Sequence, residues 1–338
     1  MTRWVGRICA SGLLACAAAL AAGSDAAHAS GPSMFSPHSP SASSITDLMW
    51  IMLGLALAVF VIVEGLLVYV LIRFRARRGD QRAPSQSAGN LRIELIWTGI
   101  PVVLVAVLFG LTLHTMSTLA SAPANALHVQ VIGHQFWWEY RYPGSGAVTA
   151  NELVVPVGRP VQLDLYAQDV IHSWWVPELA GKEDLIPGKH NTLWFTAEQA
   201  RTYLGQCAEF CGLQHAGMLL RVTALPPDQF QSWEAQQAAA AAAPAPGAAQ
   251  QGAAVFAQRT CISCHAVRGQ GAEATVAPDL THFGSRATLA AGVLDNTPQN
   301  LARWLADPQA VKPGNLMPNL KLSSDEIQQL VAYLEGLK

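Results

Sequence analysis

The sequence predicts a membrane protein made of a hairpin of two transmembrane helices, an all-β domain and a C-terminal all-α domain. Two long apolar segments, a run of short alternating strands and a final stretch with helical periodicity lead to this prediction. Charged residues make up 13% of the 338 residues, against ~25% in typical soluble proteins. The net charge is −2 and basic residues form no stripe, so we expect no nucleic-acid binding.

The N-terminus has the features of a secretory signal peptide. Arg3 and Arg7 precede an apolar run at 8–22, and a small-residue site ends at Ala29, so we expect residues 1–29 to be cleaved off. A lipoprotein site at Cys16 is the alternative. The apolar run is too short to be a third transmembrane helix.

Two apolar segments, at 45–72 and 95–119, are each long enough to cross a bilayer as a helix, so we predict a hairpin over 45–119. Pro101 lies in the second helix, where membrane proteins tolerate it. Six arginines mark the connecting segment as cytoplasmic, namely Arg73, Arg75, Arg77, Arg78, Arg82 and Arg92. Both ends of the mature chain therefore face the outer, periplasmic side of a bacterial inner membrane.

The remaining chain predicts two folded domains joined by a linker. Residues 125–225 contain short alternating segments such as ALHVQVIGHQFWWEYRY and NTLWFTA, which indicate a β-sandwich or barrel. Residues 235–250 are rich in alanine and proline and predict a tether. Residues 251–338 read as helices and loops, and the last helix has Ser324 as its expected cap.

The sequence CISCH contains the attachment motif of c-type haem. Cys261 and Cys264 would form thioethers to the porphyrin, and His265 would be the proximal iron ligand. Met317 is the only methionine after the motif, so we expect it to be the second axial ligand, with His282 as the competitor. A disulfide between the two cysteines is the alternative, which the helical context and the late methionine disfavour.

A second group of soft ligands lies in GQCAEFCGLQHAGM, where Cys207, Cys211, His215 and Met218 are close in sequence. The glycines between them indicate a loop that wraps a metal, and thiolates with imidazole and thioether favour copper. His172 is the best candidate for a second histidine, ahead of the competing His134 and His190. A Cys2His2 zinc site and a disulfide are the alternatives.

The segments HSWWVP, GQCAEFCGLQHAGM and GHQFWWEYRYP resemble subunit II of the haem-copper cytochrome c oxidases. The resemblance covers residues 45–225 and implies a cupredoxin-like fold for the all-β domain. The C-terminal segment resembles a class I cytochrome c, so the whole chain is similar to the caa-type branch, in which cytochrome c is fused to subunit II.

The resemblance implies a binuclear copper A centre in which Cys207 and Cys211 bridge two copper atoms. The implied ligand set is His172, Cys207, Glu209 through its backbone carbonyl, Cys211, His215 and Met218. The Glu209 side chain would face a magnesium ion at the interface with subunit I, and Glu94 would lie at the entrance of a proton channel. Many relatives have tryptophan where this chain has Phe136, so Trp137 and Trp138 are the candidates for electron entry.

The function implied is that of the electron-entry subunit of a cytochrome c oxidase coupled to proton translocation. Electrons would pass from an external donor, such as cytochrome c, through one covalent haem c and copper A to subunit I, where oxygen is reduced. Subunits I and III and membrane lipid are the expected partners. The alternatives are a haem c and copper A carrier of a nitric oxide reductase, and a quinol oxidase subunit without copper, which the intact ligand set disfavours.

Overall fold

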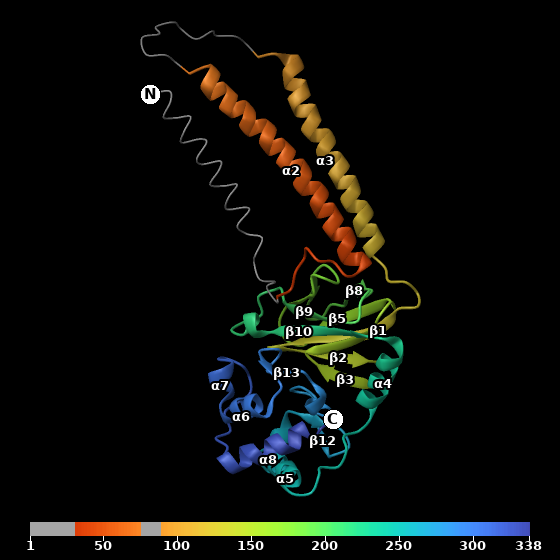
Figure 1. Cartoon of the computed structure of the whole chain (residues 1–338), viewed down its shortest axis with the longest axis vertical. Helices are drawn as coiled ribbons and strands as arrows, with labels where there is room; N and C mark the ends of the chain where they lie inside the picture. Colours follow the sequence, from red (N-terminus) through yellow and green to blue (C-terminus); the bar gives the residue numbers. More distant parts are fainter. Residues whose placement is uncertain (1–30, 76–88) are drawn as a thin grey trace. The chain divides into compact units, whose positions relative to one another are not determined.

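The computed structural model describes residues 31–75 and 89–338 (Figure 1). The predicted signal peptide at 1–29, the lipid site at Cys16 and most of the arginine-rich loop lie outside the described residues. Residues 33–338 form one unit that contains the hairpin, the all-β domain and the C-terminal domain.

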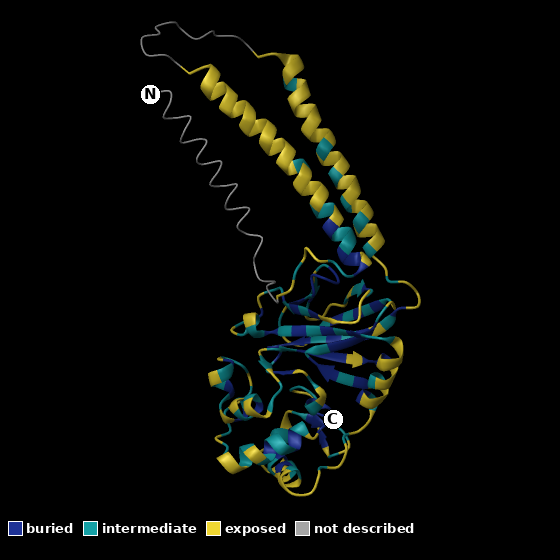
Figure 2. Cartoon of the chain, in the orientation of Figure 1, coloured by how far each residue is buried: buried dark blue, intermediate teal, exposed yellow. Residues whose placement is uncertain are grey.

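The hairpin consists of helices α2 (Pro40–Arg73) and α3 (Leu91–Leu119), both long and apolar enough to cross a membrane. Each begins four or five residues earlier than predicted because a polar side chain caps it. The Ser39 hydroxyl accepts a hydrogen bond from the Ser41 amide, and the Asn90 side chain accepts one from the Arg92 amide. Apolar side chains stay exposed along both helices, which suits contact with lipid (Figure 2).

The all-β domain contains two five-stranded sheets, with strand orders β3-β2-β1-β5-β8 and β4-β10-β9-β6-β7. Strand β1 pairs parallel with β5, and β10 pairs parallel with β4, while their other neighbours are antiparallel. The strands are β1 (Leu127–His134), β2 (Trp137–Tyr142), β3 (Ala147–Ala150), β4 (Glu152–Pro156), β5 (Val161–Ala167), β6 (His172–Trp175), β7 (Glu183–Leu185), β8 (Asn191–Phe195), β9 (Thr202–Cys207) and β10 (Leu219–Leu225).

Alternating side chains from both sheets form one aromatic-rich core between them. Trp138, Trp174 and Tyr140 are fully buried, and burial of each large side chain contributes roughly 2–3 kcal/mol. The buried Tyr142 hydroxyl donates to the Val154 carbonyl and accepts from the Val154 amide. This core holds the ends of β6 and β9 in fixed positions, and the candidate metal ligands lie there.

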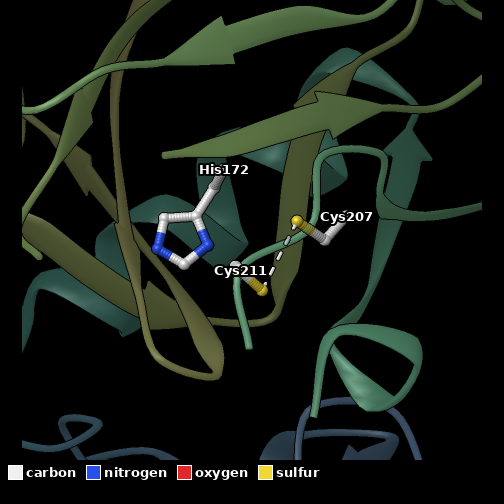
Figure 3. Close-up of side chains that lie close together, drawn as sticks. All are labelled: His172, Cys207 and Cys211. Carbon is white, nitrogen blue, oxygen red and sulfur yellow. Dashed lines mark hydrogen bonds between the residues drawn. The ribbon is translucent and has the colours of Figure 1, made fainter. Parts of the chain in front are cut away.

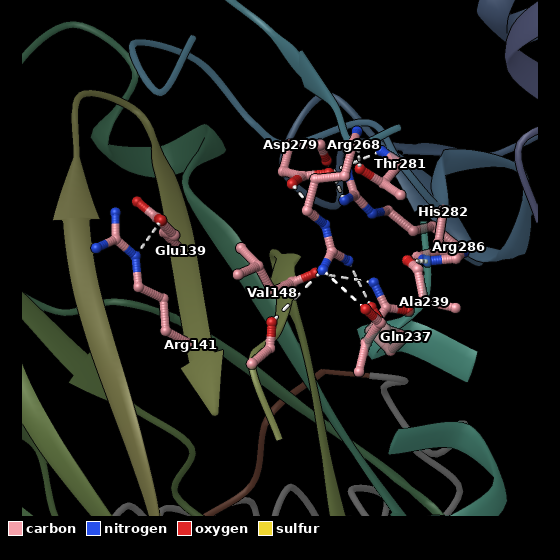
Figure 4. A network of polar contacts seen from close by, with 12 residues as sticks. Glu139, Arg141, Val148, Gln237, Ala239, Arg268, Asp279, Thr281, His282 and Arg286 are labelled. Atoms are coloured by element: carbon pink, nitrogen blue, oxygen red, sulfur yellow. Dashed lines mark hydrogen bonds and ion pairs between the residues drawn. The ribbon is translucent and has the colours of Figure 1, made fainter. Parts of the chain in front are cut away.

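The predicted linker is shorter and better anchored than a free tether. Helix α4 (Pro227–Ala238) takes up its first residues and helix α5 (Ala248–Gln258) its last ones, because alanine favours helix. Arg268 of the C-terminal domain donates hydrogen bonds to the carbonyls of Gln237 and Ala238, and Gln237 donates to the Val148 carbonyl of the sheet (Figure 4). The connection is therefore fastened at its start to both domains.

The C-terminal domain is mainly helical, as predicted, with two short two-stranded ribbons in addition. Helix α8 (Ser324–Glu335) packs across α5 at Gly252, where a Cβ atom would overlap the α8 backbone. Ser323, one residue before the predicted cap, forms a capping box with Glu326. The other elements are η3 (Cys261–Ser263), β11 (Ala266–Val267), β12 (Ala272–Glu273), η4 (Phe283–Ser285), β13 (Thr288–Leu289), β14 (Leu294–Asp295), α6 (Pro298–Ala306) and α7 (Pro308–Val311).

Candidate metal centre and haem cleft

The loop between β9 and β10 carries most of the predicted metal ligands. Strand β9 ends at Cys207, and the chain returns to the sheet at Leu219 after one short turn, η2 (His215–Gly217). Gly212 has a φ of 127°, which an L-residue rarely adopts. The cysteines and histidine therefore lie on a loop, as their glycine-rich spacing predicts, and not on one face of a helix.

Within this loop the soft ligand atoms converge on one point. The Cys211 sulfur lies 3.9 Å from the Cys207 sulfur, 3.8 Å from His215 Nδ1 and 3.8 Å from the Met218 sulfur. The Cys207 sulfur lies 3.2 Å from the Glu209 carbonyl oxygen. Both cysteines and Met218 are buried, so the loop encloses its sulfur atoms.

His172, at the start of β6, completes the group. Its ligand atom and the sulfurs of Cys207 and Cys211 all lie within 4.8 Å of one another (Figure 3). Nε2 lies 2.8 Å from Asp169 Oδ1, while the buried Nδ1 has no hydrogen-bond partner among the described residues. Because buried polar atoms are nearly always satisfied, this free nitrogen fits a metal ligand whose tautomer the carboxylate fixes.

The two thiols have the electrostatics of a cation site. At 3.9 Å their sulfurs are far beyond the ~2.05 Å of a disulfide, which argues against that alternative. The hydrogen bond between them lowers the pKa of Cys207 to about 3 and raises the pKa of Cys211. Two thiolates this close repel each other, so a cation is needed to hold both in the ionised form.

The competing histidines of the all-β domain lie outside this group. His134 Nε2 is 3.0 Å from Glu139 Oε2, and its ring stacks on Trp137 with centroids 4.1 Å apart. The half-exposed His190 lies 3.3 Å from an Asp164 oxygen. Both imidazoles are thus engaged by carboxylates of their own.

The acidic residues singled out in the sequence have separate settings. The Glu209 carbonyl faces the Cys207 sulfur, but its side chain is partly exposed and lies 3.9 Å from Lys182 Nζ. Glu94 lies in the first turn of α3. Among the described residues, the group of three or more candidate metal ligands is His172, Cys207 and Cys211, and neither glutamate belongs to it.

The C-terminal domain and the turn at 135–137 of the all-β domain line a cleft that contains all four residues predicted to hold the haem. Cys261, Cys264, His265 and Met317 surround a cavity of about 280 Å³. A hydrogen bond from His265 Nδ1 to the Pro278 carbonyl, 2.8 Å long, leaves Nε2 free as an iron ligand. Burial lowers the pKa of His265, which favours the neutral, metal-binding imidazole.

The competing His282 points elsewhere. Its Nε2 lies 3.0 Å from the carbonyl oxygen of Ala239 in the linker, and it does not line the cleft (Figure 4). Both cleft cysteines are free, so the disulfide alternative is not formed. The residues present therefore fit a covalently attached haem with a histidine and a methionine on its two sides.

The three aromatic residues after Gln135 have different exposures. Phe136 and the fully buried Trp138 belong to the sandwich core. Trp137 is half-buried and lines the haem cleft together with Phe136. Trp137 is thus the electron-entry candidate that faces the C-terminal domain, while Trp138 packs edge-on against His172 with centroids 6.0 Å apart.

Sequence reasoning missed three residues that support these sites: Asp169, Gln135 and Lys312. Asp169 precedes His172 by three residues, a spacing that allows a carboxylate to reach the imidazole, and this signal was available. Gln135 lies inside GHQFWWEYRYP, where only the aromatic residues are predicted to have a role, in electron entry. Lys312 has no local pattern that distinguishes it from a surface lysine.

Comparison with known proteins agrees with this architecture. Three family models match, described as cytochrome C oxidase subunit II, transmembrane domain (residues 28–114), cytochrome C oxidase subunit II, periplasmic domain (residues 147–225), and cytochrome c (residues 249–338). Cytochrome c oxidase subunit 2 of Alkalihalophilus pseudofirmus is 37% identical over 309 residues, which is 89% of this chain and 90% of the relative.

Two further similarities concern the same family. Cytochrome c oxidase subunit 2 of Bacillus sp. strain PS3 is 38% identical over 286 residues, covering 78% of this chain and 80% of the relative. The crystal structure of the periplasmic domain of subunit II of cytochrome oxidase (CoxB) of Bradyrhizobium japonicum is 31% identical. It covers 34% of this chain and 94% of that chain, with a TM-score of 0.33.

The chain belongs to the cytochrome c oxidase subunit II family and carries a cytochrome c domain after its periplasmic domain. The predicted family and the fold class are both confirmed. Membership makes the chain a subunit of a haem-copper oxidase complex, and it implies a copper A centre in the cupredoxin-like domain and a haem c in the C-terminal domain.

Proposed function

We propose that this chain is the electron-entry subunit of a proton-translocating terminal oxidase. When bound, haem c and copper A would accept electrons one at a time from an external donor and deliver them to subunit I, where oxygen is reduced. The observation that carries the proposal is that two redox-type ligand sets, a Cys2His2Met group with buried sulfur atoms and a CxxCH cleft, lie in adjoining domains of one chain.

In the metal centre, we assign Cys207 and Cys211 as the two shared thiolates and His172 and His215 as one terminal ligand each. The unpaired Nδ1 of His172 and the 3.8 Å approach of His215 Nδ1 to the Cys211 sulfur support this assignment. Met218 and the Glu209 carbonyl would act as weak further ligands. Burial of Cys207, Cys211 and Met218 would keep their sulfur atoms in place whichever charge the centre carries.

A structural zinc site would use the same two cysteines and two histidines. The Met218 side chain argues for copper, because it is fully buried and its sulfur lies 3.8 Å from the Cys211 sulfur. Thioethers are soft ligands that suit copper, and closed zinc sites are complete with four nitrogen and sulfur ligands. The resemblance to copper A proteins agrees with this choice.

In the cleft, we assign Cys261 and Cys264 to the covalent bonds and His265 and Met317 to the iron. The Pro278 carbonyl fixes the His265 ring and increases its basicity. A methionine ligand raises the haem potential, which suits an electron carrier that donates to copper.

The remaining assignments extend this proposal to the membrane complex. We expect subunits I and III and membrane lipid around α2 and α3, a proton-channel entrance beside Glu94, and a magnesium ion held by Glu209 together with subunit I. Both soluble domains would then lie on the periplasmic face, where an external donor can reach the haem cleft.

Metal analysis and spectroscopy of the purified holo-complex test the proposal. We expect two copper atoms and one haem iron per chain, with near-infrared bands of a mixed-valence copper pair. The Cys207→Ser variant should lose copper and keep haem, and Cys261→Ser should disturb haem attachment and keep copper. Zinc in the first site, or a single copper per chain, would overturn it.

A further inference from the structure

A buried lysine lies where the C-terminal domain meets the all-β domain. Lys312 follows α7, and only 4% of its surface is exposed. Its ammonium group donates hydrogen bonds to the carbonyls of Phe136, at 3.0 Å, and Ala290, at 3.2 Å. Lysine is rarely buried to this degree, because its charge must be removed from water. The two acceptors belong to different domains, so the side chain joins them.

The residue that accepts this bond belongs to a turn that also supports the metal ligands. The Gln135 side chain donates from Nε2 to the Cys211 carbonyl at 2.6 Å, and the Gln135 backbone amide donates to Asp169 Oδ2 at 2.6 Å. The other oxygen of Asp169 holds His172 Nε2. The turn at 135–136 therefore contacts the cysteine loop directly and the histidine through one carboxylate.

On the other side, the loop that carries Lys312 also carries the proposed iron ligand. Gln309 Nε2 donates to the carbonyls of Asn315 and Met317, at 2.9 and 3.0 Å, and Asn315 Nδ2 donates to the Lys312 carbonyl at 2.6 Å. These bonds make residues 312–317 one rigid loop. Lys312, Met317 and Phe136 also line the same cleft.

Other contacts around Lys312 have the character of a built interface. The Leu219 amide donates to the Ala291 carbonyl at 3.1 Å. The Glu152 carboxylate accepts from the amides of Ala287 and Thr288 at 3.0 and 2.7 Å. Three backbone amides that cross the interface therefore report whether the domains are docked.

We infer that Lys312 is a positioning residue that fixes the Met317 loop onto the 135–136 turn and so couples the haem site to the metal centre. The connection runs from Lys312 Nζ to the Phe136 carbonyl, along the chain to Gln135, and through its side chain to the Cys211 carbonyl. The inference rests on the proposed function. When bound, the haem held by His265 and Met317 would supply one electron at a time to the metal held by the cysteine loop, and Lys312 would only position the two sites.

The Lys312 bonds give the haem domain a fixed docking geometry, which a free tether would not provide. A haem domain held only by its linker would transfer electrons at a rate set by its local concentration. A docked domain transfers them at a rate set by the connection across the interface. Loss of Lys312 should then slow transfer even though the linker is intact.

Lys312→Met in the full-length holo-complex tests the inference, with the exposed Lys338→Met as control. We expect hydrogen exchange at the Leu219, Ala287 and Thr288 amides to accelerate at least about ten-fold, the size expected for one lost charged hydrogen bond. Haem-to-copper transfer after flash photoreduction should slow by a similar factor, with haem and copper contents unchanged. Lys312→Arg should restore part of both.

Unchanged exchange and unchanged transfer in a metal-replete Lys312→Met complex would overturn the inference. Faster exchange with an unchanged transfer rate would also overturn it, because docking would then not govern coupling. The proposed function fails separately, if the wild-type complex lacks the copper pair or the haem. The exchange measurement on the interface amides remains readable in that case.

Discussion

Asp169 offers the sharpest test of the metal centre, because its carboxylate accepts three hydrogen bonds. The Gln135 amide lies 2.6 Å away, the Val170 amide 2.7 Å and His172 Nε2 2.8 Å. These bonds lower the pKa of Asp169 despite its partial burial, which by itself raises that pKa. The Asp169→Asn variant keeps the size of the side chain and removes one of its two acceptor oxygens.

The structure sets the size of the effect. If the remaining oxygen accepts from His172 and Val170, the new side-chain NH2 group faces the backbone N–H of Gln135, and two hydrogen-bond donors then point at each other. If the amide is reversed, it meets His172 Nε2 instead. Either way at least one charge-assisted bond is lost, at a cost of about 1.5–3 kcal/mol. Loss of a carboxylate that orients a metal-binding histidine lowers metal affinity about 10- to 100-fold, or roughly 1.4–2.8 kcal/mol.

Competition with a copper chelator measures this affinity on the full-length holo-complex. The exposed Asp228 in the first turn of α4 supplies the matched control, Asp228→Asn, and haem content provides an internal reference for folding. We expect a 10- to 100-fold loss of copper affinity in Asp169→Asn, with the control near wild type. An affinity of Asp169→Asn within about two-fold of wild type would refute the role assigned to this carboxylate.

Three further variants test the C-terminal domain. Gly252→Ala places a Cβ atom inside the α8 backbone, so the overpacking cost of about 1–3 kcal/mol or more should outweigh the ~1 kcal/mol gain in helix propensity. We expect the thermal unfolding midpoint of this variant to fall. The control Gly144→Ala has open space around it and should keep the wild-type midpoint. A hydrogen bond from Arg259 lowers the pKa of Glu326 to about 2. Ionised Glu326 therefore stabilises the fold above its unfolded pKa of ~4.3, and this stabilisation is lost as the pH falls toward 2. The stability of the Glu326→Gln variant should depend less on pH over that window. Met317→Ala should lower the haem reduction potential in potentiometric titration, whereas His282→Ala should leave it unchanged, and the reverse would exchange their roles.

Much of the fold was predictable because the strongest signals are local. The apolar lengths of the two helices, the alternation of the strands and the alanine-rich segment each depend on nearby residues. The errors lie at boundaries, where one side chain decides. Ser39 and Asn90 extend the hairpin helices toward their N-termini, and Ser323 takes the capping role expected of Ser324. Such choices between neighbouring polar residues depend on tertiary contacts.

The proposed metal and haem ligands could be selected from the sequence for a related reason. Cys207, Cys211 and His215 lie on one loop, so their spacing in the sequence nearly gives their spacing in space. His172 had to come from a distant strand, and it was preferred to His134 for its loop setting in HSWWVP. In the structure, Asp169 orients His172, while Glu139 engages His134. The two histidines therefore differ in their carboxylate partners, and no local sequence pattern shows which carboxylate each histidine contacts.

The contacts between the domains were beyond prediction because they join residues that are far apart in the chain. Gln135 reaches Cys211 across 76 residues, and Lys312 reaches Phe136 across 176. A single sequence contains no period or spacing that pairs such positions. The alanine-rich linker even suggested the opposite arrangement, a tethered domain. Its composition does not reveal that Arg268 donates hydrogen bonds to its first residues.

These contacts give a physical explanation for phenylalanine at position 136, where the resemblance leads us to expect tryptophan. Lys312 bonds to the backbone carbonyl of this residue, which any side chain would present, so the junction does not need an indole there. The phenyl ring instead fills space against Gly212, where an added Cβ would lie 3.1 Å from two ring atoms. Residue 136 and residue 212 are therefore matched in size. The next residue, Trp137, lines the cleft, so an aromatic side chain faces the proposed haem site although residue 136 is not a tryptophan.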